Sequence, residues 1–376
     1  MERKLTKTGA TSLAAFCCLS MWIGIGCSTD IDLTAPYERT PVVFSLLEAA
    51  QDTQWVRINR TWLGDGNQFD SAMVQDSSEY DRDDLIVAMD ERSGEQVLRT
   101  WQLQDTVIEN KSTDGIFYGP NHQMWFFVPE GGLDSEAEYD FSMDIADGTH
   151  AEASTNMIAT QAGNITQPPP GVVNFKFGFA SIGFTTTYPD VTFKWSSTEG
   201  ASQYDISMRI HVTERIWADL EHTQLVDELD RIIEWPMGSL RTDTDEGGEV
   251  LQKEVNGERF FTTLSTQLVE DPYITRVLGS WDENVQIARA FDFILTIANE
   301  ELATYLEINS PVTGVIQERP EYTNINGGLG LFASRASQGV YGVGYTTSTI
   351  EQLMEGDATA ALNFCTPNPF SDFFCD

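Results

Sequence analysis

Residues that could do chemistry are either few or without a recognisable spacing in this sequence. The four histidines show no HxH or HExxH spacing, and no G-x-S-x-G segment occurs, so the signatures of metal-dependent and serine hydrolases are absent. Asp and Glu number 58, and in such abundance no two carboxylates stand out as the acid and base of a glycosidase. We therefore predict no catalytic residues, no enzymatic activity and no cofactor.

Two features could be interpreted as ligand-binding sites, but the spacing and context of their residues do not support this. Acidic clusters at 79–84 and 243–249 contain oxygen ligands suited to calcium, but neither has the glycine and glutamate positions of an EF-hand loop. Both are interpreted as solvated loops, and we predict no metal site. Gly327, Gly328 and Gly330 lack the context of a nucleotide-binding loop, and they are better explained by positive φ angles and tight packing.

The first 27 residues have the order of a lipoprotein signal. A positively charged start precedes an apolar stretch from Leu13 to Gly26, and the small Gly26 stands directly before Cys27. This order predicts cleavage before Cys27 and its modification by acyl chains such as palmitate, each buried methylene contributing about 0.8 kcal/mol to anchoring. The alternatives are an ordinary secretory signal and an uncleaved anchor. The second is disfavoured because the apolar stretch is shorter than the roughly 20 residues that span a bilayer.

The residues that follow Cys27 predict where the anchored protein resides. Ser28 and Thr29 stand where an aspartate commonly retains lipoproteins at the inner membrane, which favours the outer membrane. Asp30 and Asp32 come next, and an acidic patch at this place directs some lipoproteins to the cell surface. We expect a lipid-anchored outer-membrane protein at the cell surface. A formal net charge of −36 makes nucleic acid an unsuitable partner, since phosphate backbones would repel it.

Cys365 and Cys375 are the cysteines that remain outside the signal and the lipidation site. Nine residues, two of them prolines, separate the pair, so a disulfide that closes a C-terminal loop is geometrically easy. Loop entropy gives such a bond about 2 to 3 kcal/mol of stabilisation. A metal pair or two reactive thiols is the alternative, but a structural zinc site needs four ligands and no histidine lies nearby. We predict the disulfide.

Alternation of apolar and polar residues predicts a mainly β fold. Seven short segments between Val42 and Ile145, rich in β-branched and aromatic residues, are typical of an immunoglobulin-like sandwich. Three consecutive prolines then predict an extended linker, followed by a second β-rich domain with a few short helices. The predicted division is a signal peptide at 1–26, the lipidated cysteine and a tether at 27–39, the sandwich at 40–162, the linker at 163–173 and the C-terminal β-rich domain at 174–376.

Three local motifs of the second domain predict particular turns and helix ends. Asn256-Gly257, between two strand-like segments, predicts a two-residue β-hairpin. Asn299 predicts the N-cap of a helix over 300–307. Ser348 and Glu351 predict a capping box for a helix over 349–354.

A run near the C-terminus, Asn324–Phe332, is the most specific motif of the chain. It has the pattern Asn-Ile-x-Gly-Gly-Leu-Gly-x-Phe and follows a helix that contains a tyrosine. With it, the chain resembles domain-of-unknown-function family 4249, a family of exported Bacteroidota lipoproteins. The resemblance covers nearly the whole mature chain, and its other segments are Asp30–Leu33, Pro41–Val43, the hairpin 84–103, Tyr139, Asp147–Thr149, Phe291–Ile297 and Glu300–Leu306. It implies a two-part, β-rich surface or periplasmic lipoprotein, often encoded near a TonB-dependent transporter, and no catalytic residues.

These observations favour one class of function. We expect a non-enzymatic outer-membrane lipoprotein that is an accessory or ligand-capturing partner of a TonB-dependent transporter. The alternative is an adhesin or a structural component of the cell surface.

Overall fold

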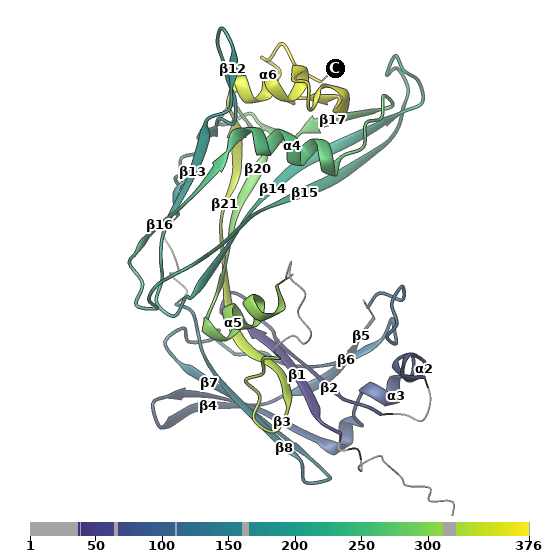
Figure 1. The fold of residues 1–376 in the computed structure, drawn as a ribbon, viewed down its shortest axis with the longest axis vertical. Helices are drawn as coiled ribbons and strands as arrows, with labels where there is room; N and C mark the ends of the chain where they lie inside the picture. The colour runs from purple at the N-terminus through teal and green to yellow at the C-terminus, as the bar shows by residue number, and fades with distance from the viewer. Residues whose placement is uncertain are drawn as a thin grey trace, which may run out of the picture. The chain divides into compact units, whose positions relative to one another are not determined.

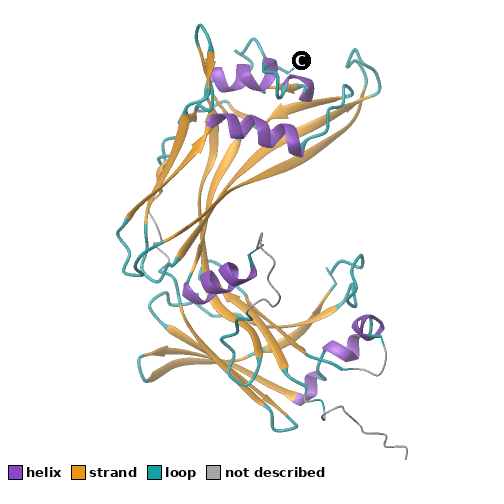
Figure 2. Ribbon diagram, viewed as in Figure 1, coloured by secondary structure: helices purple, strands orange, loops and turns teal. Residues whose placement is uncertain are grey.

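Residues 40–376 form a mainly β structure with several sheets and a few short helices (Figure 1 and Figure 2). The computed structural model describes Tyr37 and residues 39–63, 67–109, 111–159, 165–310 and 321–375. By its contacts the chain divides into residues 1–39 and 40–376. The signal peptide and Cys27 lie outside the described residues, so lipidation stays a prediction.

A two-sheet sandwich is built mainly from the first 120 or so residues of this unit. One sheet has the order β4-β3-β7-β8, and the strands β5-β6-β2-β1 belong to the other. Inward side chains of both sheets, such as Val43, Val87 and Phe141, meet in one buried cluster. The elements are β1 (Pro41–Leu47), β2 (Gln54–Arg60), α2 (Gln68–Ala72), α3 (Gln75–Ser78), η1 (Arg82–Asp84), β3 (Leu85–Ser93), β4 (Gln96–Gln102), β5 (Gln104–Ile108), β6 (His122–Phe127), β7 (Glu138–Ile145) and β8 (His150–Asn156).

A strand from far along the chain completes this sandwich. β21 (Leu329–Tyr345) lies parallel to β1, with Gly330 opposite Val43. The fully buried ring of Phe332 joins the sandwich core, 6.0 Å from the ring of Phe141. Gly330 has a φ of 118°, and a Cβ atom at this position would lie 1.9 Å from the Val43 carbonyl oxygen, in agreement with the positive φ and the tight packing predicted for the glycine motif. The segment predicted as the second domain therefore supplies a strand to the predicted first one, and the division into two domains stays a prediction.

The other half of β21 belongs to a second core. There β21 pairs with β20, β20 pairs with β14, and β14 pairs with β15. Phe193 of β13 stacks on Phe293 of β20 at 4.7 Å, and Phe260 of α4 stacks on Phe179 at 4.4 Å. The elements are β9 (Ile165–Gln167), β10 (Lys176–Phe177), β11 (Ser181–Ile182), β12 (Thr186–Thr187), β13 (Asp190–Ser196), β14 (Gln203–Trp217), β15 (Leu225–Arg241), β16 (Val250–Asn256), α4 (Gly257–Gln267), β17 (Ile274–Leu278), β18 (Ser280–Asp282), β19 (Ile287–Arg289), β20 (Phe291–Ala298), α5 (Glu300–Asn309), α6 (Thr347–Glu355), η2 (Ala360–Leu362) and β22 (Phe364–Cys365).

The Asn256-Gly257 dipeptide does not form the predicted β-hairpin. Strand β16 ends at Asn256 and helix α4 begins at Gly257. The Asn256 side chain accepts a hydrogen bond from the Glu258 N–H at 3.0 Å, so this asparagine caps a helix. A Cβ atom at position 257 would lie 2.1 Å from the Phe179 carbonyl oxygen, which accounts for the glycine without a turn.

Both predicted helices are present, and one of their predicted caps is wrong. Asn299 caps α5 by accepting a hydrogen bond from the Leu302 N–H at 3.2 Å, as predicted. Helix α6 begins at Thr347 with Thr346 as its N-cap residue and no side-chain cap hydrogen bond. Ser348 therefore lies inside the first turn and cannot form the predicted capping box.

The proline-rich segment 163–173 is only partly an extended spacer. Its residues Ile165–Gln167 form β9, which pairs with β13. Pairing is possible there because the three prolines begin at position 168, and the preceding residues keep their N–H groups.

The C-terminal loop is closed by a disulfide between Cys365 and Cys375, whose Cα atoms are 5.2 Å apart. The loop is attached to the second core because β22 pairs with β17. Arg276 of β17 is buried and donates a hydrogen bond to the Leu362 carbonyl at 2.8 Å, next to the start of the loop. These contacts hold the start of the loop in place, and the loop carries aromatic residues.

Candidate functional site

A groove of about 540 Å³ lies on the outer face of the sandwich beside helix α5. Strands β1 and β2 and the turn between them contribute the floor and one end, while α5 and β21 contribute the opposite wall. The apolar and aromatic lining residues are Phe44, Leu46, Trp55, Leu302, Tyr305, Leu306 and Leu331. In size and lining this groove is of the kind that holds small ligands.

Strand alternation explains why apolar side chains reach this outer face. Val43 and Leu47 of β1 point into the sandwich core and are fully buried. Phe44 and Leu46 point the opposite way, and Phe44 is 39% exposed. The ring of Tyr305 on α5 approaches Phe44 edge-on, with centroids 6.1 Å apart. The aromatic groups of the floor and the wall are therefore in contact before any ligand arrives.

One ion pair marks the polar end of the groove. Nε of Arg335 donates to the Glu48 carboxylate at 2.9 Å, and Glu48 is buried while the Arg335 side chain is 43% exposed. Gln54 holds the adjoining turn, because its side-chain amide bonds the N–H and the carbonyl of Glu48 and the carbonyl of Gln51. Gln54 thus holds the backbone of Glu48 in place, and the Glu48 carboxylate holds the Arg335 guanidinium through the ion pair.

A second candidate surface consists of loops at one end of the second core, around α6 (Figure 1). We define this end surface as residues 181–187, 218–224, 268–273, 355–358 and 366–375. Contacts connect its loops: His222 bonds the Pro272 carbonyl at 2.8 Å, and Asn363, which precedes β22, bonds the Asp271 carbonyl at 3.1 Å. Helix α6 contacts both β11 and β22.

Large apolar side chains stand out from the end surface. Phe184, at the tip of the β11–β12 hairpin, is fully exposed, and Phe370 of the disulfide loop is 78% exposed. Leu220, Val269 and Tyr273 are exposed on the other loops. Large exposed apolar groups that lie together are typical of interaction sites, and helix α6 contacts both the β11–β12 hairpin, which carries Phe184, and β22, which precedes the loop that carries Phe370.

The charge of the end surface has a single sign. Its five segments contain seven carboxylates and no Lys or Arg, the carboxylates being Asp219, Glu221, Glu270, Asp271, Glu355, Asp357 and Asp372. Hydrogen bonds from Thr223 and Gln224 hold the pKa of Asp219 below its usual range, which keeps this carboxylate ionised. Four of the five segments therefore carry negative charge, and the 181–187 hairpin with Phe184 carries no charge of its own.

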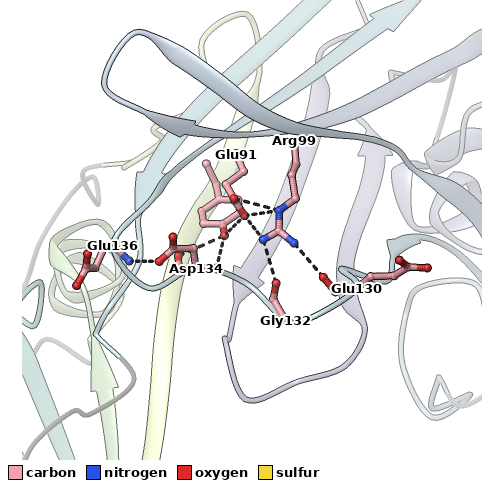
Figure 3. A network of polar contacts seen from close by, with 7 residues as sticks. Glu91, Arg99, Glu130, Gly132, Asp134 and Glu136 are labelled. Atoms are coloured by element: carbon pink, nitrogen blue, oxygen red, sulfur yellow. Dashed lines mark hydrogen bonds and ion pairs between the residues drawn. The ribbon is translucent and has the colours of Figure 1, made fainter.

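A buried polar network lies in the sandwich (Figure 3). Glu91 is 3% exposed and receives two hydrogen bonds of 3.0 Å from Nε of Arg99 as well as an ion pair from Nη2. Arg99 also donates to the Glu130 and Gly132 carbonyls at 3.0 Å. Tyr139 donates to Glu91 at 2.7 Å, and burial together with this carboxylate raises the pKa of its hydroxyl.

This network joins three parts of the sandwich and does not open on the groove. The Tyr139 hydroxyl also accepts the Asp134 N–H at 2.8 Å, so it ties the β6–β7 loop to strand β7. The buried charges of Glu91 and Arg99 are paired with each other, and none of the network's residues lines the groove beside α5. We therefore assign the network to stability.

Of the sequence-predicted site residues, Cys27 lies outside the described residues, and the other two lie at the C-terminal loop. Cys365 and Cys375 are joined and close the loop that presents Phe370. In the described part of the chain, no three His, Cys, Asp or Glu side chains gather as a metal site would require. No helix among the described residues is long and apolar enough to cross a membrane. The groove was missed, and its only sequence signal is the outward position of Phe44 and Leu46 in an alternating strand.

Similarity to known proteins adds little to this description. No family model matches the chain. No curated protein matches it either. The C-terminal globular domain of an oligosaccharyltransferase from Pyrococcus abyssi aligns with a TM-score of 0.22 and 9% identity over 63% of this chain and 45% of that one. Trypsin-activated alpha-2-macroglobulin from Escherichia coli aligns with a TM-score of 0.17 and 12% identity over 82% of this chain and 16% of that one.

The chain thus spans less than half of the first structure and about a sixth of the second. At such TM-scores neither structure defines a shared fold, and the proposals below rest on the chain's own residues.

Proposed function

We propose that this chain is a non-enzymatic, lipid-anchored protein of the outer membrane that docks on a partner protein through its end surface. The partner that fits the sequence features is a TonB-dependent transporter, for which the chain would be an accessory or a ligand-capturing component. Membership of domain-of-unknown-function family 4249 is part of the same proposal.

The observation that carries this proposal is the combination of exposed apolar tips with uniform negative charge. Phe184 and Phe370 offer exposed aromatic anchors, and a few such residues dominate the binding energy of protein interfaces. The seven carboxylates of the end surface suit a partner that presents Lys and Arg beside an apolar patch, since complementary charge speeds association and selects the partner. Anionic phospholipid surfaces would be repelled.

The anchor is tested by replacing the predicted lipidated cysteine. We expect Cys27→Ser to abolish incorporation of radiolabelled palmitate and to release the protein from the outer-membrane fraction, because no other residue would carry the acyl chains. Cys365→Ser is the matched control and should keep the label. Absence of palmitate from the wild-type protein would contradict the lipoprotein assignment.

Docking is tested with point variants of the full chain after cross-linking in intact cells. We expect the Phe184→Ser, Phe370→Ser double variant to lose at least about nine-tenths of a co-purified transporter, because two exposed anchors of an interface are removed. The Ile86→Ser, Val97→Ser variant removes two exposed apolar side chains from the sandwich and should retain the partner. Retention by the first variant contradicts the docking surface, and co-purification of no envelope protein favours the adhesin alternative.

Point variants are required here because truncation would not leave an intact remainder. Deleting residues 174–376 would remove β21, which pairs with β1 and places Phe332 in the sandwich core. Loss of a partner after such a deletion would report unfolding of the sandwich as much as loss of an interface.

A further inference from the structure

We propose that the groove beside α5 binds an amphipathic anion, namely an apolar chain or ring that ends in one carboxylate, with the carboxylate held by Arg335. This inference goes beyond the proposed docking and does not depend on it, because the groove lies on the sandwich and the end surface lies on the second core.

The floor and the wall of the groove fit the apolar part of the ligand. Phe44, Leu46 and Trp55 present exposed faces from β1 and β2. Tyr305 and Leu306 face them from α5. Covering these side chains with an apolar chain would remove aromatic and aliphatic surface from water, which favours binding.

The polar end of the ligand must bind a group of the groove that the protein does not already use in a hydrogen bond. The amide of Gln54 is used by the backbone of the β1–β2 turn, and the Ser45 hydroxyl donates to the Trp55 carbonyl at 2.9 Å. Arg335 uses only its Nε, on Glu48, and its two Nη nitrogens have no hydrogen-bond partner among the described residues. Within the described part of the chain, this end of the groove therefore presents two nitrogens of one guanidinium that no protein group occupies.

The geometry of a guanidinium then selects the anionic group. Two Nη nitrogens side by side match the two oxygens of a carboxylate, and Arg recognises carboxylates through such paired hydrogen bonds. Glu48 is the other charged residue that lines the groove, and its carboxylate already faces Nε of Arg335. The buried Glu48 thus holds Nε of a guanidinium whose side chain is partly exposed.

Other ligand classes fit less well. A sugar requires hydrogen-bond partners around its ring, and two polar side chains of the groove floor, Ser45 and Gln54, are engaged within the β1–β2 pair. An apolar cation would meet the guanidinium of Arg335 at the polar end, while the Glu48 carboxylate is already compensated. An uncharged apolar chain would leave the two Nη donors without a partner.

The test uses the full-length chain with Cys27→Ser, so that no attached acyl chain competes for the groove. Decanoate, decanol and decyltrimethylammonium share one tail and differ in their head group, and calorimetry compares their binding. We expect decanoate to bind at least about tenfold more tightly than decanol, because a hydrogen bond to a charged group adds this much affinity. We expect no binding of the cation.

Variants then assign the site. Arg335→Gln should weaken decanoate binding about tenfold or more and leave decanol unchanged. Tyr305→Ala should weaken both ligands by a similar factor, about fivefold, since it removes tail contacts. Glu48→Gln should tighten decanoate binding, because it removes the negative charge beside the guanidinium. This gain cannot arise from partial unfolding, so the proposal stays testable if Arg335→Gln folds poorly.

The matched control is Arg209→Gln. Arg209 pairs with Glu234 at 2.9 Å on the surface of β14 and β15, away from the groove, and its loss should change neither ligand. Equal binding of decanol and decanoate, an unchanged decanoate affinity in Arg335→Gln, or no binding of decanoate at about 10 mM would each overturn the proposal. None of these outcomes bears on co-purification of a transporter, which tests the proposed function separately.

Discussion

Replacing Gly330 by alanine is expected to lower the free energy of unfolding by about 4 kcal/mol or more, a loss seen only for severe structural conflicts. A Cβ atom at this position would lie 1.9 Å from the carbonyl oxygen of Val43. Gly330 and Val43 are opposite each other in the β1–β21 pair, so the two backbones cannot separate without breaking this pairing. The φ of 118° adds strain for any residue with a side chain. Urea unfolding monitored by circular dichroism measures the change.

Gly94→Ala is the matched control for this experiment. Gly94 also has a positive φ, of 59°, but nothing lies within 4 Å of the position of its Cβ atom. Only the left-handed backbone is then unfavourable, and the expected cost is about 1 kcal/mol. Similar losses in the two variants would show that the approach of β21 to β1 does not govern the stability of the sandwich.

The local features of this fold could be predicted where a short stretch of sequence determines them. Alternation in β1 and β6, the cap of α5 by Asn299 and the disulfide between Cys365 and Cys375 all depend on residues within about ten positions of one another. The prediction of a β-hairpin at Asn256-Gly257 was wrong, although it also depended on neighbouring residues. Asparagine can begin a turn or cap a helix, and the choice was decided by the contact of Gly257 with the distant Phe179 carbonyl.

The candidate sites could not be predicted because distant segments build them. The groove needs α5 and β21 beside β1, and a parallel pair between residues nearly 290 positions apart leaves no local pattern. The end surface likewise joins five loops whose contacts, such as that of His222 with the Pro272 carbonyl, appear only in the folded chain. The composition predicted the negative charge of the end surface. The fold determined which exposed apolar side chains belong to the same surface.

Removing the guanidinium from the buried network gives the second large effect. We expect Arg99→Ala to lower the free energy of unfolding by about 3 kcal/mol, because it leaves the Glu91 carboxylate buried without its cation. The value is placed at the lower end of the range for buried ion pairs, since 34% of the Arg99 side chain is exposed. Tyr139 would still donate to Glu91, but one neutral hydrogen bond does not replace an ion pair.

A double variant separates the cost of the unpaired carboxylate from the loss of contacts. Glu91→Leu together with Arg99→Leu removes both charges and keeps apolar volume, so the protein should recover at least half of the stability lost in Arg99→Ala. Arg92→Ala breaks the partly exposed pair with Asp140, 2.7 Å in length, and should change the unfolding midpoint far less than Arg99→Ala does. If the double variant is less stable than Arg99→Ala, the network stabilises the sandwich through specific hydrogen bonds, and charge compensation is the lesser part of its role.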